Sequence, residues 1–190
     1  MKERKLLICV DFQNDFVNGS MRIDGAEEVC KKFKGFINNK FKEYYHIAMT
    51  MDFHPYNHCS FDTFARHCVS YSEGAAIEKH VLEGVLNHKT SKETVAFYKK
   101  GTNQNKEEFS IFQNNFDGIR LLSRIEGYNF NRIDICGIAS EYCVYNTVKD
   151  LVDKGYGNLI NLLPEFIVSM GDDEKLLNYA KENNLKISEE

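Results

Sequence analysis

KLLICVD, residues 5–11, is a short apolar run that ends in an aspartate. A run of this length without alternating polar residues is typical of a strand buried on both faces of a parallel sheet. The segment AEEVCKKFKGFINNKFKEY, residues 26–44, places apolar side chains at helical spacing, and HIAMTMD, residues 46–52, is a second apolar run. Strand, helix and strand in this order predict one βαβ unit of a parallel sheet.

The same alternation continues along the rest of the chain. Further strands are predicted at residues 94–99, 132–138, 158–163 and 185–187, and helices at residues 118–127, 141–155 and 172–183. The two prolines, Pro55 and Pro164, are expected just beyond strand ends, where a sheet tolerates them. Residues 73–92 contain no motif that indicates a structure or a role. The length of 190 residues predicts one α/β domain over residues 1–190.

Composition narrows the expected partners of the chain. It contains 24 Lys and Arg against 28 Asp and Glu, a formal charge of −4, which provides no general attraction for nucleic acid or an anionic membrane. A small neutral or weakly charged molecule is the expected partner. The first apolar run, residues 6–10, is too short for a signal peptide or a spanning helix, so a cytoplasmic protein is expected. The six cysteines form no C-x-x-C pair and are expected to be free thiols there.

Polar residues at the predicted strand ends are the first place to look for chemistry. In an open α/β sheet, ligands bind outside the carboxyl ends of the strands. The residues at these positions are Asp11, Asp52 with His54, Lys99 or Lys100, and the segment 137–143. They are expected to meet at one edge of the sheet.

The segment GIASEYC, residues 137–143, joins a predicted strand to a predicted helix. Ser140 is a favourable N-cap, which would place Cys143 in the first helical turn, where free backbone N–H groups favour a thiolate. A nucleophile also needs a base and a group that stabilises charge, and Asp11 and a strand-end lysine are available at the same edge. Each residue alone has a structural alternative: a buried cysteine, a turn-forming aspartate or a solvated lysine. Only the set indicates a nucleophile site.

A second group of polar residues surrounds the end of the second strand. Asp52 and His54 are two residues apart, so in an extended chain both side chains leave the same face, and His67 follows after a loop. One carboxylate and two imidazoles suit Zn²⁺, Mn²⁺ or Fe²⁺. The spacing is undemanding, and from the residues alone a chance arrangement is the alternative.

Five segments together resemble the nicotinamidase branch of the isochorismatase-like cysteine hydrolases. They are VDFQNDF (residues 10–16), DFHPYNHCSF (52–61), HCVS (67–70), YKKGT (98–102) and GIASEYCV (137–144). They occur in the order typical of that family and span most of the chain. The resemblance implies a Rossmann-like, three-layer α/β/α fold with a six-stranded, mainly parallel sheet.

The resemblance also implies a catalytic triad of Cys143, Lys100 and Asp11. Lys100 is preferred to Lys99 because the lysine of the family directly precedes a glycine, and neighbouring residues of a strand face opposite sides. A cis peptide is implied before the nucleophile, at residues 138–139. It would direct the backbone N–H groups of Ala139 and Cys143 toward one point as an oxyanion hole.

For the second group, the resemblance implies that Asp52, His54 and His67 bind one divalent metal ion, with zinc as the first choice and manganese or iron as alternatives. His58 and Ser60 occupy positions that provide a further ligand in some members, or they support the other ligands. Cys59 and Cys68 are expected to be packing residues. A further set is expected to form the substrate pocket: Phe16, Phe64 and Ile138.

The function implied by the resemblance is hydrolysis of nicotinamide to nicotinate and ammonia in NAD salvage, through a cysteine thioester, with the metal holding the pyridine nitrogen. The alternatives are a related cysteine amidase that acts on a pyrazinamide-like or carbamoyl substrate, and a catalytically silent metal-binding member. A flavodoxin-like nucleotide-binding module is disfavoured because no glycine-rich phosphate loop follows a strand. A homo-oligomer is expected only from the habits of the family.

Overall fold

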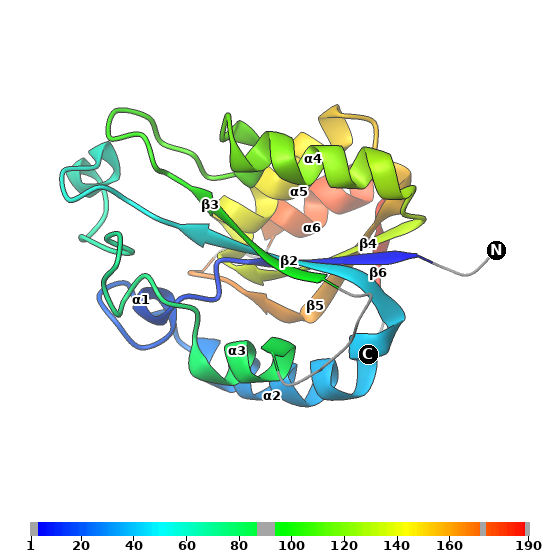
Figure 1. Ribbon diagram of the computed structural model, residues 1–190, viewed down its shortest axis with the longest axis horizontal. Coiled ribbons are helices and arrows are strands. Elements are labelled where there is room, and N and C mark those ends of the chain that lie inside the picture. The colour runs from blue at the N-terminus through cyan, green and yellow to red at the C-terminus, as the bar shows by residue number, and fades with distance from the viewer. Residues whose placement is uncertain (1–3, 87–93, 172–173, 189–190) are drawn as a thin grey trace.

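Figure 1 shows the computed structural model, which describes residues 4–86, 94–171 and 174–188. Six strands form one sheet in the order β3-β2-β1-β4-β5-β6, and every neighbouring pair is parallel. The strands are Lys5–Val10 (β1), Tyr44–Asp52 (β2), Thr94–Lys100 (β3), Arg132–Ile138 (β4), Ile160–Val168 (β5) and Lys186–Ile187 (β6). The predicted six-stranded parallel sheet is confirmed.

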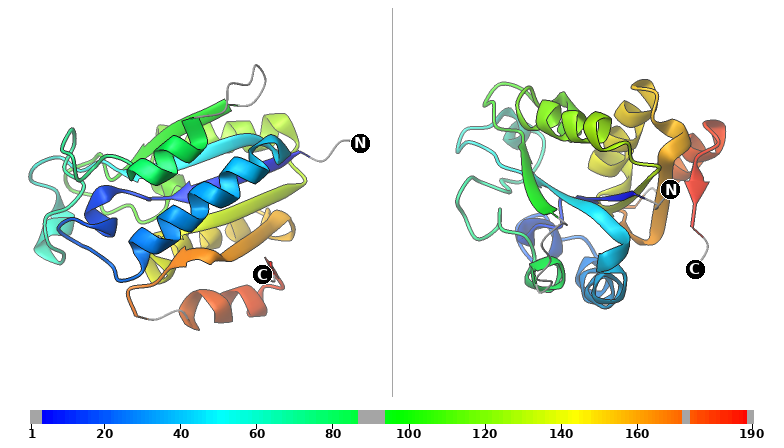
Figure 2. Two further views of the ribbon diagram at one scale, coloured as in Figure 1. Left: turned by 90° about the horizontal axis from the view of Figure 1, so that it is seen from below. Right: turned by 45° about the vertical axis from the view of Figure 1, so that its right-hand side comes forward.

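Helices cover both faces of the sheet, so the three-layer prediction is also confirmed (Figures 1 and 2). One face carries α1 (Asn14–Val17), α2 (Ala26–Lys40) and α3 (Lys79–Leu86), and the other carries α4 (Asp117–Tyr128), α5 (Tyr145–Asp153) and α6 (Glu174–Glu182). Short 3-10 turns occur at Phe41–Glu43, Cys59–Asp62, Ile111–Gln113 and Gly157–Leu159. Across the described ranges, no helix has both the length and the apolar character needed to cross a lipid bilayer.

The central strand β1 explains why KLLICVD has no polar alternation. Leu7 and Cys9 pack into the core on the side of α2, whereas Leu6, Ile8 and Val10 pack on the side of α4 and α5. All five side chains are fully buried. A strand covered on both faces therefore needs apolar residues at every position.

Several element boundaries differ from the predictions. The helix expected over residues 26–44 ends at Lys40, because a 3-10 turn intervenes and Tyr44 already belongs to β2. The helix expected over residues 141–155 is split into a π-helical turn, Ser140–Val144, and α5.

Two further helices lie in or beside segments that the predictions did not cover. The start of the helix expected over residues 172–183 lies outside the described residues, and α6 is described from Glu174. Helix α3 lies in the segment for which no prediction was possible.

Pro164 lies inside β5, and the expectation that it follows a strand end is wrong. The pairing of β4 with β5 changes register around it, from Ile135 opposite Leu162 to Gly137 opposite Ile167. Proline has no backbone N–H to donate, and an irregularity of this kind is where a sheet accepts it. The strand therefore continues beyond the proline to Val168.

Candidate active site

The carboxyl ends of β1, β2, β3 and β4 meet at one edge of the sheet. Asp11 follows β1 directly, Asp52 is the last residue of β2, Lys100 is the last residue of β3, and Cys143 lies in the π-helical turn after β4. Side chains that are distant in the sequence thus converge because parallel strands end together.

Lys100 is the centre of this group. Its Nζ lies 2.8 Å from Asp11 Oδ2, 2.5 Å from Asp52 Oδ1 and 3.4 Å from Cys143 Sγ. The Lys100 side chain has no exposed surface. A buried ammonium needs such compensation, since removing a charge from water without a partner is costly.

Lys99, the alternative lysine, lies on the opposite face of β3. Its Nζ is 3.8 Å from the centre of the Phe53 ring and makes a cation–π contact there. The alternation of side chains along a strand separates the two lysines. Lys100 is therefore the lysine that the structure brings to the site.

Asp11 is fully buried and has a left-handed backbone conformation, with φ of 50°. Thr50 Oγ1 donates a hydrogen bond of 2.6 Å to Asp11 Oδ1. Burial raises the pKa of the Asp11 carboxyl, and the neighbouring Lys100 ammonium opposes that rise. Thr50 was not predicted as a site residue, although its position two residues before Asp52 places it on the same face of β2.

The turn that carries Cys143 differs from the predicted helix start. Ala139 occupies the N-cap position, no side chain caps the turn, and the Ala139 carbonyl accepts hydrogen bonds from the N–H groups of Tyr142 and Val144. The expectation of a Ser140 cap is wrong. The Ile138–Ala139 peptide is cis, as the resemblance implied.

The direction in which the pKa of Cys143 is shifted also differs from the expectation. Burial raises the pKa of the Cys143 thiol well above its ordinary value, although Lys100 acts in the opposite direction. The position at the start of a helix is thus insufficient to maintain a thiolate. A base must remove the proton, and Asp11 has a carboxylate oxygen within 4.8 Å of Cys143 Sγ.

The three residues of the predicted metal site also come together. One ligand atom from each of Asp52, His54 and His67 lies within 4.8 Å of the other two. Nδ1 of His54 contacts the Gly101 carbonyl at 3.0 Å, and Nδ1 of His67 contacts the Ala65 carbonyl at 2.7 Å. Because a carbonyl can only accept, both Nδ1 atoms must carry the hydrogen.

His54 Nε2 is therefore left with a lone pair. It is buried, makes no hydrogen bond among the residues that the structure describes, and lies 3.7 Å from Asp52 Oδ2. Burial lowers the pKa of His54 to about 3, so the ring is neutral near pH 7. An unpaired lone pair facing a carboxylate is the arrangement that a bound cation would satisfy, and the donor set fits a divalent ion.

His58 packs against His54, and both of its ring nitrogens have partners within the protein. Its Nε2 contacts the Lys106 carbonyl at 3.1 Å, its Nδ1 accepts from the Ser60 N–H at 3.2 Å, and its ring stacks on His54 with 4.0 Å between centres. Both ring nitrogens are thus engaged. Ser60 is buried and lines the adjoining pocket.

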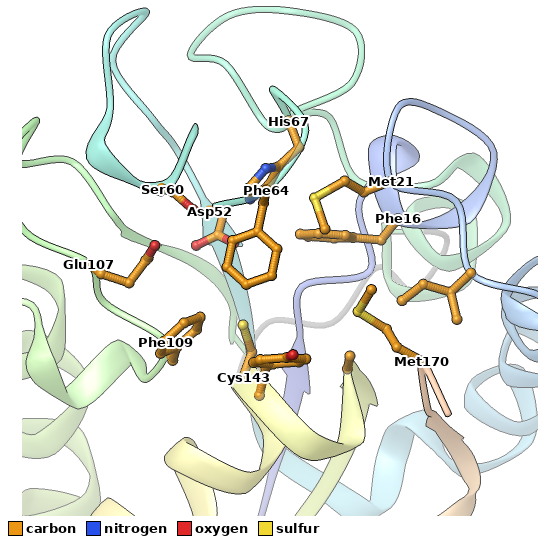
Figure 3. A pocket seen from close by; sticks show the side chains of 13 residues that line it. Phe16, Met21, Asp52, Ser60, Phe64, His67, Glu107, Phe109, Cys143 and Met170 are labelled. Atoms are coloured by element: carbon orange, nitrogen blue, oxygen red, sulfur yellow. The ribbon is translucent and has the colours of Figure 1, made fainter. Parts of the chain in front are cut away.

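The pocket opens beside these groups, and its empty space is about 400 Å³ with the open mouth included (Figure 3). It is lined by Phe16, Met21, Ile23, Asp52, Ser60, Phe64, His67, Glu107, Phe109, Ala139, Tyr142, Cys143 and Met170. Phe16 and Phe64 line it as expected. Ile138 does not, because it is packed in the core beneath. Tyr142 was missed, although it directly precedes Cys143.

Gln13 was also missed, and it holds the end of β2 in place. Its Nε2 donates to the carbonyls of Asp52 and Ala75, at 2.7 and 2.9 Å, and its Oε1 accepts from the Asp52 N–H at 2.8 Å. The side chain is fully buried. The available signal was an uncharged amide three residues after the strand end, in DFQND, for which no role was predicted.

Replacing Gly101 with alanine should destabilise the fold by about 1–3 kcal/mol and weaken the binding of a divalent ion at Asp52, His54 and His67 by about 10- to 100-fold. Gly101 has φ of 62°, and a Cβ there would lie 2.4 Å from His54 Cε1. Urea unfolding and zinc titration measure the two effects. Gly35→Ala is the control, because Gly35 lies within α2 with open space around it and should gain stability. Equal behaviour of the two variants would contradict the prediction.

Comparison with known proteins adds independent observations. The sequence-family model of the isochorismatase domain matches residues 5–161 of this chain. Among curated proteins, the nicotinamidase of Saccharomyces cerevisiae is 24% identical over 94% of both chains, and the nicotinamidase/pyrazinamidase of Mycobacterium tuberculosis is 29% identical over 80% of both. Among solved structures, the Pyrococcus horikoshii pyrazinamidase in complex with zinc is 28% identical, with a TM-score of 0.80 over 98% of this chain and 99% of that one. The yeast nicotinamidase bound to nicotinaldehyde, at 21% identity, superposes with a TM-score of 0.83 over 98% of this chain and 100% of that one.

Proposed function

The chain belongs to the isochorismatase domain family, and from that premise we propose that it is a nicotinamidase that hydrolyses nicotinamide to nicotinate and ammonia. The observation that carries the proposal is the contact of Lys100 Nζ with Asp11, Asp52 and Cys143. Asp52 and Cys143 of this group line an aromatic pocket. The names of the curated relatives support the choice of substrate.

The chain's own residues supply the acid, the base and the nucleophile. Asp11 accepts the proton of the Cys143 thiol, and the thiolate attacks the amide carbon of the substrate. Lys100 stabilises the anions that form at Asp11 and Cys143. The backbone N–H groups of Ala139 and Cys143 form the oxyanion hole.

The second half of the reaction uses the same groups in reverse. Protonated Asp11 donates its proton to the departing ammonia, which leaves a nicotinoyl thioester on Cys143. Asp11 then takes a proton from water, and the hydroxide attacks the thioester carbon. The C–S bond then breaks, and Asp11 returns its proton to the Cys143 sulfur, which restores the thiol. The other proton of the water stays on the product acid, which releases it to solvent as nicotinate.

Asp52, His54 and His67 would hold one divalent ion, with zinc preferred and manganese or iron as alternatives. The chemistry that this ion supplies when bound is a Lewis-acid contact for the pyridine nitrogen, which orients the ring. Phe16, Phe64 and the other aromatic lining residues would enclose that ring. Orientation converts a weak encounter into a positioned attack on the carboxamide.

The test is ammonia release from nicotinamide by the purified protein, before and after treatment with a chelator. The expected result is turnover that falls at least about 100-fold on metal removal and returns with added zinc, because the ion positions the substrate. Elemental analysis identifies the resident metal. Release from pyrazinamide or a carbamoyl substrate but not from nicotinamide would transfer the proposal to a related amidase. No release by metal-loaded protein from any of these amides would indicate a silent member.

We also propose a role in NAD salvage, on the basis of this activity, and a location in the cytoplasm, as expected from the sequence. A homo-oligomer is proposed only from the family, and light scattering measures it directly.

A further inference from the structure

Glu108 is a buried carboxylate to which the proposed reaction gives no role. Only 3% of its surface is exposed. Its Oε2 accepts from the Gly101 N–H and from Asn114 Nδ2, both at 2.9 Å, and its Oε1 pairs with Lys106 Nζ at 2.9 Å. Both oxygens of the buried carboxylate thus have donors, which compensates for its removal from water.

These donors also keep Glu108 charged. Burial acts to raise the pKa of the Glu108 carboxyl, but the hydrogen bonds from Lys106, Asn114 and the Gly101 N–H outweigh burial, and the pKa lies below its ordinary value. Glu108 is therefore an anion near pH 7. A charged acceptor forms a strong hydrogen bond with a backbone N–H, so Glu108 holds the backbone at Gly101 in place.

Gly101 connects Glu108 to the residues of the metal site. The Gly101 N–H donates to Glu108, and the Gly101 carbonyl accepts from His54 Nδ1 at 3.0 Å. The contact with His54 keeps the hydrogen of the ring on Nδ1 and leaves the Nε2 lone pair facing Asp52 Oδ2, 3.7 Å away. Gly101 has φ of 62°, and a glycine leaves such a conformation readily unless neighbouring groups hold it.

A second connection between Glu108 and His54 runs through Lys106. Lys106 Nζ pairs with the Glu108 carboxylate, and the Lys106 carbonyl lies 3.1 Å from His58 Nε2. The His58 ring stacks on the ring of His54, with 4.0 Å between centres. Glu108 thus contacts both of the backbone segments, at Gly101 and at Lys106, that support the two stacked imidazoles.

We infer that Glu108 is a positioning residue for the metal site, which holds His54, through Gly101, in the orientation that binds a divalent ion. The inference rests on the ion site of the proposed function and is independent of which amide is the substrate. Without the carboxylate, the buried Gly101 N–H would lose its acceptor. The segment would then shift to recover a partner, and the carbonyl that orients His54 would shift with it.

The test measures the zinc affinity of the purified apoprotein by competition with a chromogenic chelator. Glu108→Ala should weaken zinc binding by about 10- to 100-fold, the range for groups that orient metal ligands. Glu108→Gln should remain within about threefold of the wild type, because its amide oxygen can still accept from the Gly101 N–H. Lys106 Nζ keeps its hydrogen bond to the Gln113 carbonyl in that variant.

Asn161→Ala is the control for a general loss of stability. Asn161 is buried near the start of β5, at the amino end of the parallel sheet and away from the site, and its Nδ2 donates to Asp134 Oδ1 at 2.7 Å. Urea unfolding of the apoproteins should show lower stability in both Asn161→Ala and Glu108→Ala, since each leaves a buried polar group without its partner. Zinc affinity should fall only in Glu108→Ala.

Unchanged zinc affinity in Glu108→Ala would overturn the inference, and so would an equal loss of affinity in Asn161→Ala. A loss in Glu108→Gln as large as that in Glu108→Ala would also overturn it, because the hydrogen bond to Gly101 would then not be the cause. Ammonia release from nicotinamide by wild type, with unchanged zinc affinity in Glu108→Ala, would keep the proposed function and reject this inference. The expected pattern of affinities in a protein that binds zinc but releases no ammonia would reject the proposed function and keep this inference.

Discussion

Ammonia release from nicotinamide should fall by about 1,000-fold or more when Cys143 is replaced with alanine, because no other group can form the thioester. The Cys143 side chain is buried 3.4 Å from Lys100 Nζ, and truncation removes one sulfur atom from a site that keeps its ion pairs. The variant should therefore fold, with a modest loss of stability. Circular dichroism and urea unfolding check the fold, and a coupled ammonia assay measures the rate.

Cys59→Ala is the matched control for this variant. Cys59 lies close in sequence to the metal residues but is only half-buried and is absent from the pocket lining. Its removal should change the rate by less than about twofold, as for a surface substitution away from a site. Activity of Cys143→Ala above one tenth of the wild type would reject covalent catalysis by this cysteine.

Replacing Asp11 with asparagine should lower kcat/KM by about 100- to 10,000-fold, the range found when a general base is removed. The amide keeps the shape of the side chain and can still accept from Thr50, but it cannot take the proton of a thiol whose pKa burial has raised. Lys100 keeps its contact with Asp52, so the buried ammonium retains one carboxylate partner.

Two measurements separate a lost base from a disturbed fold. Alkylation of Cys143 by iodoacetamide should slow in Asp11→Asn, because less thiolate forms, while zinc binding should persist on Asp52, His54 and His67. Asp62→Asn is the control, since Asp62 is exposed in a 3-10 turn. Unchanged alkylation together with lost zinc would show that Asp11 has a structural role instead.

Helix starts and strand irregularities were predicted less well than the strands themselves. The π-helical turn at Ser140–Val144 depends on carbonyl contacts of Ala139, and Ser140 looks like an ordinary N-cap until those contacts are known. Pro164 was expected just beyond a strand end, but a change of register in the pairing with β4 accommodates it within β5. In both cases the outcome depends on a neighbouring backbone that local propensity does not describe.

The sequence by itself determined the strands of the sheet and the polar residues at their carboxyl ends. Fully apolar runs such as KLLICVD require a strand covered on both faces, and parallel strands end at one edge, so Asp11, Asp52 and Cys143 could be expected to meet there. That inference needs only periodicity and strand direction. Both can be inferred from the order of the residues along the chain.

Only the tertiary structure decided which groups are engaged and in which state. In the folded protein, Lys100 lies in the site and Lys99 lies over the Phe53 ring. Both ring nitrogens of His58 make hydrogen bonds, whereas His54 Nε2 has no partner among the described residues. Burial also raises the pKa of the Cys143 thiol, and Glu107 lines the pocket. These outcomes depend on burial and on contacts between segments that are distant in the chain, and the local pattern of residues contains neither.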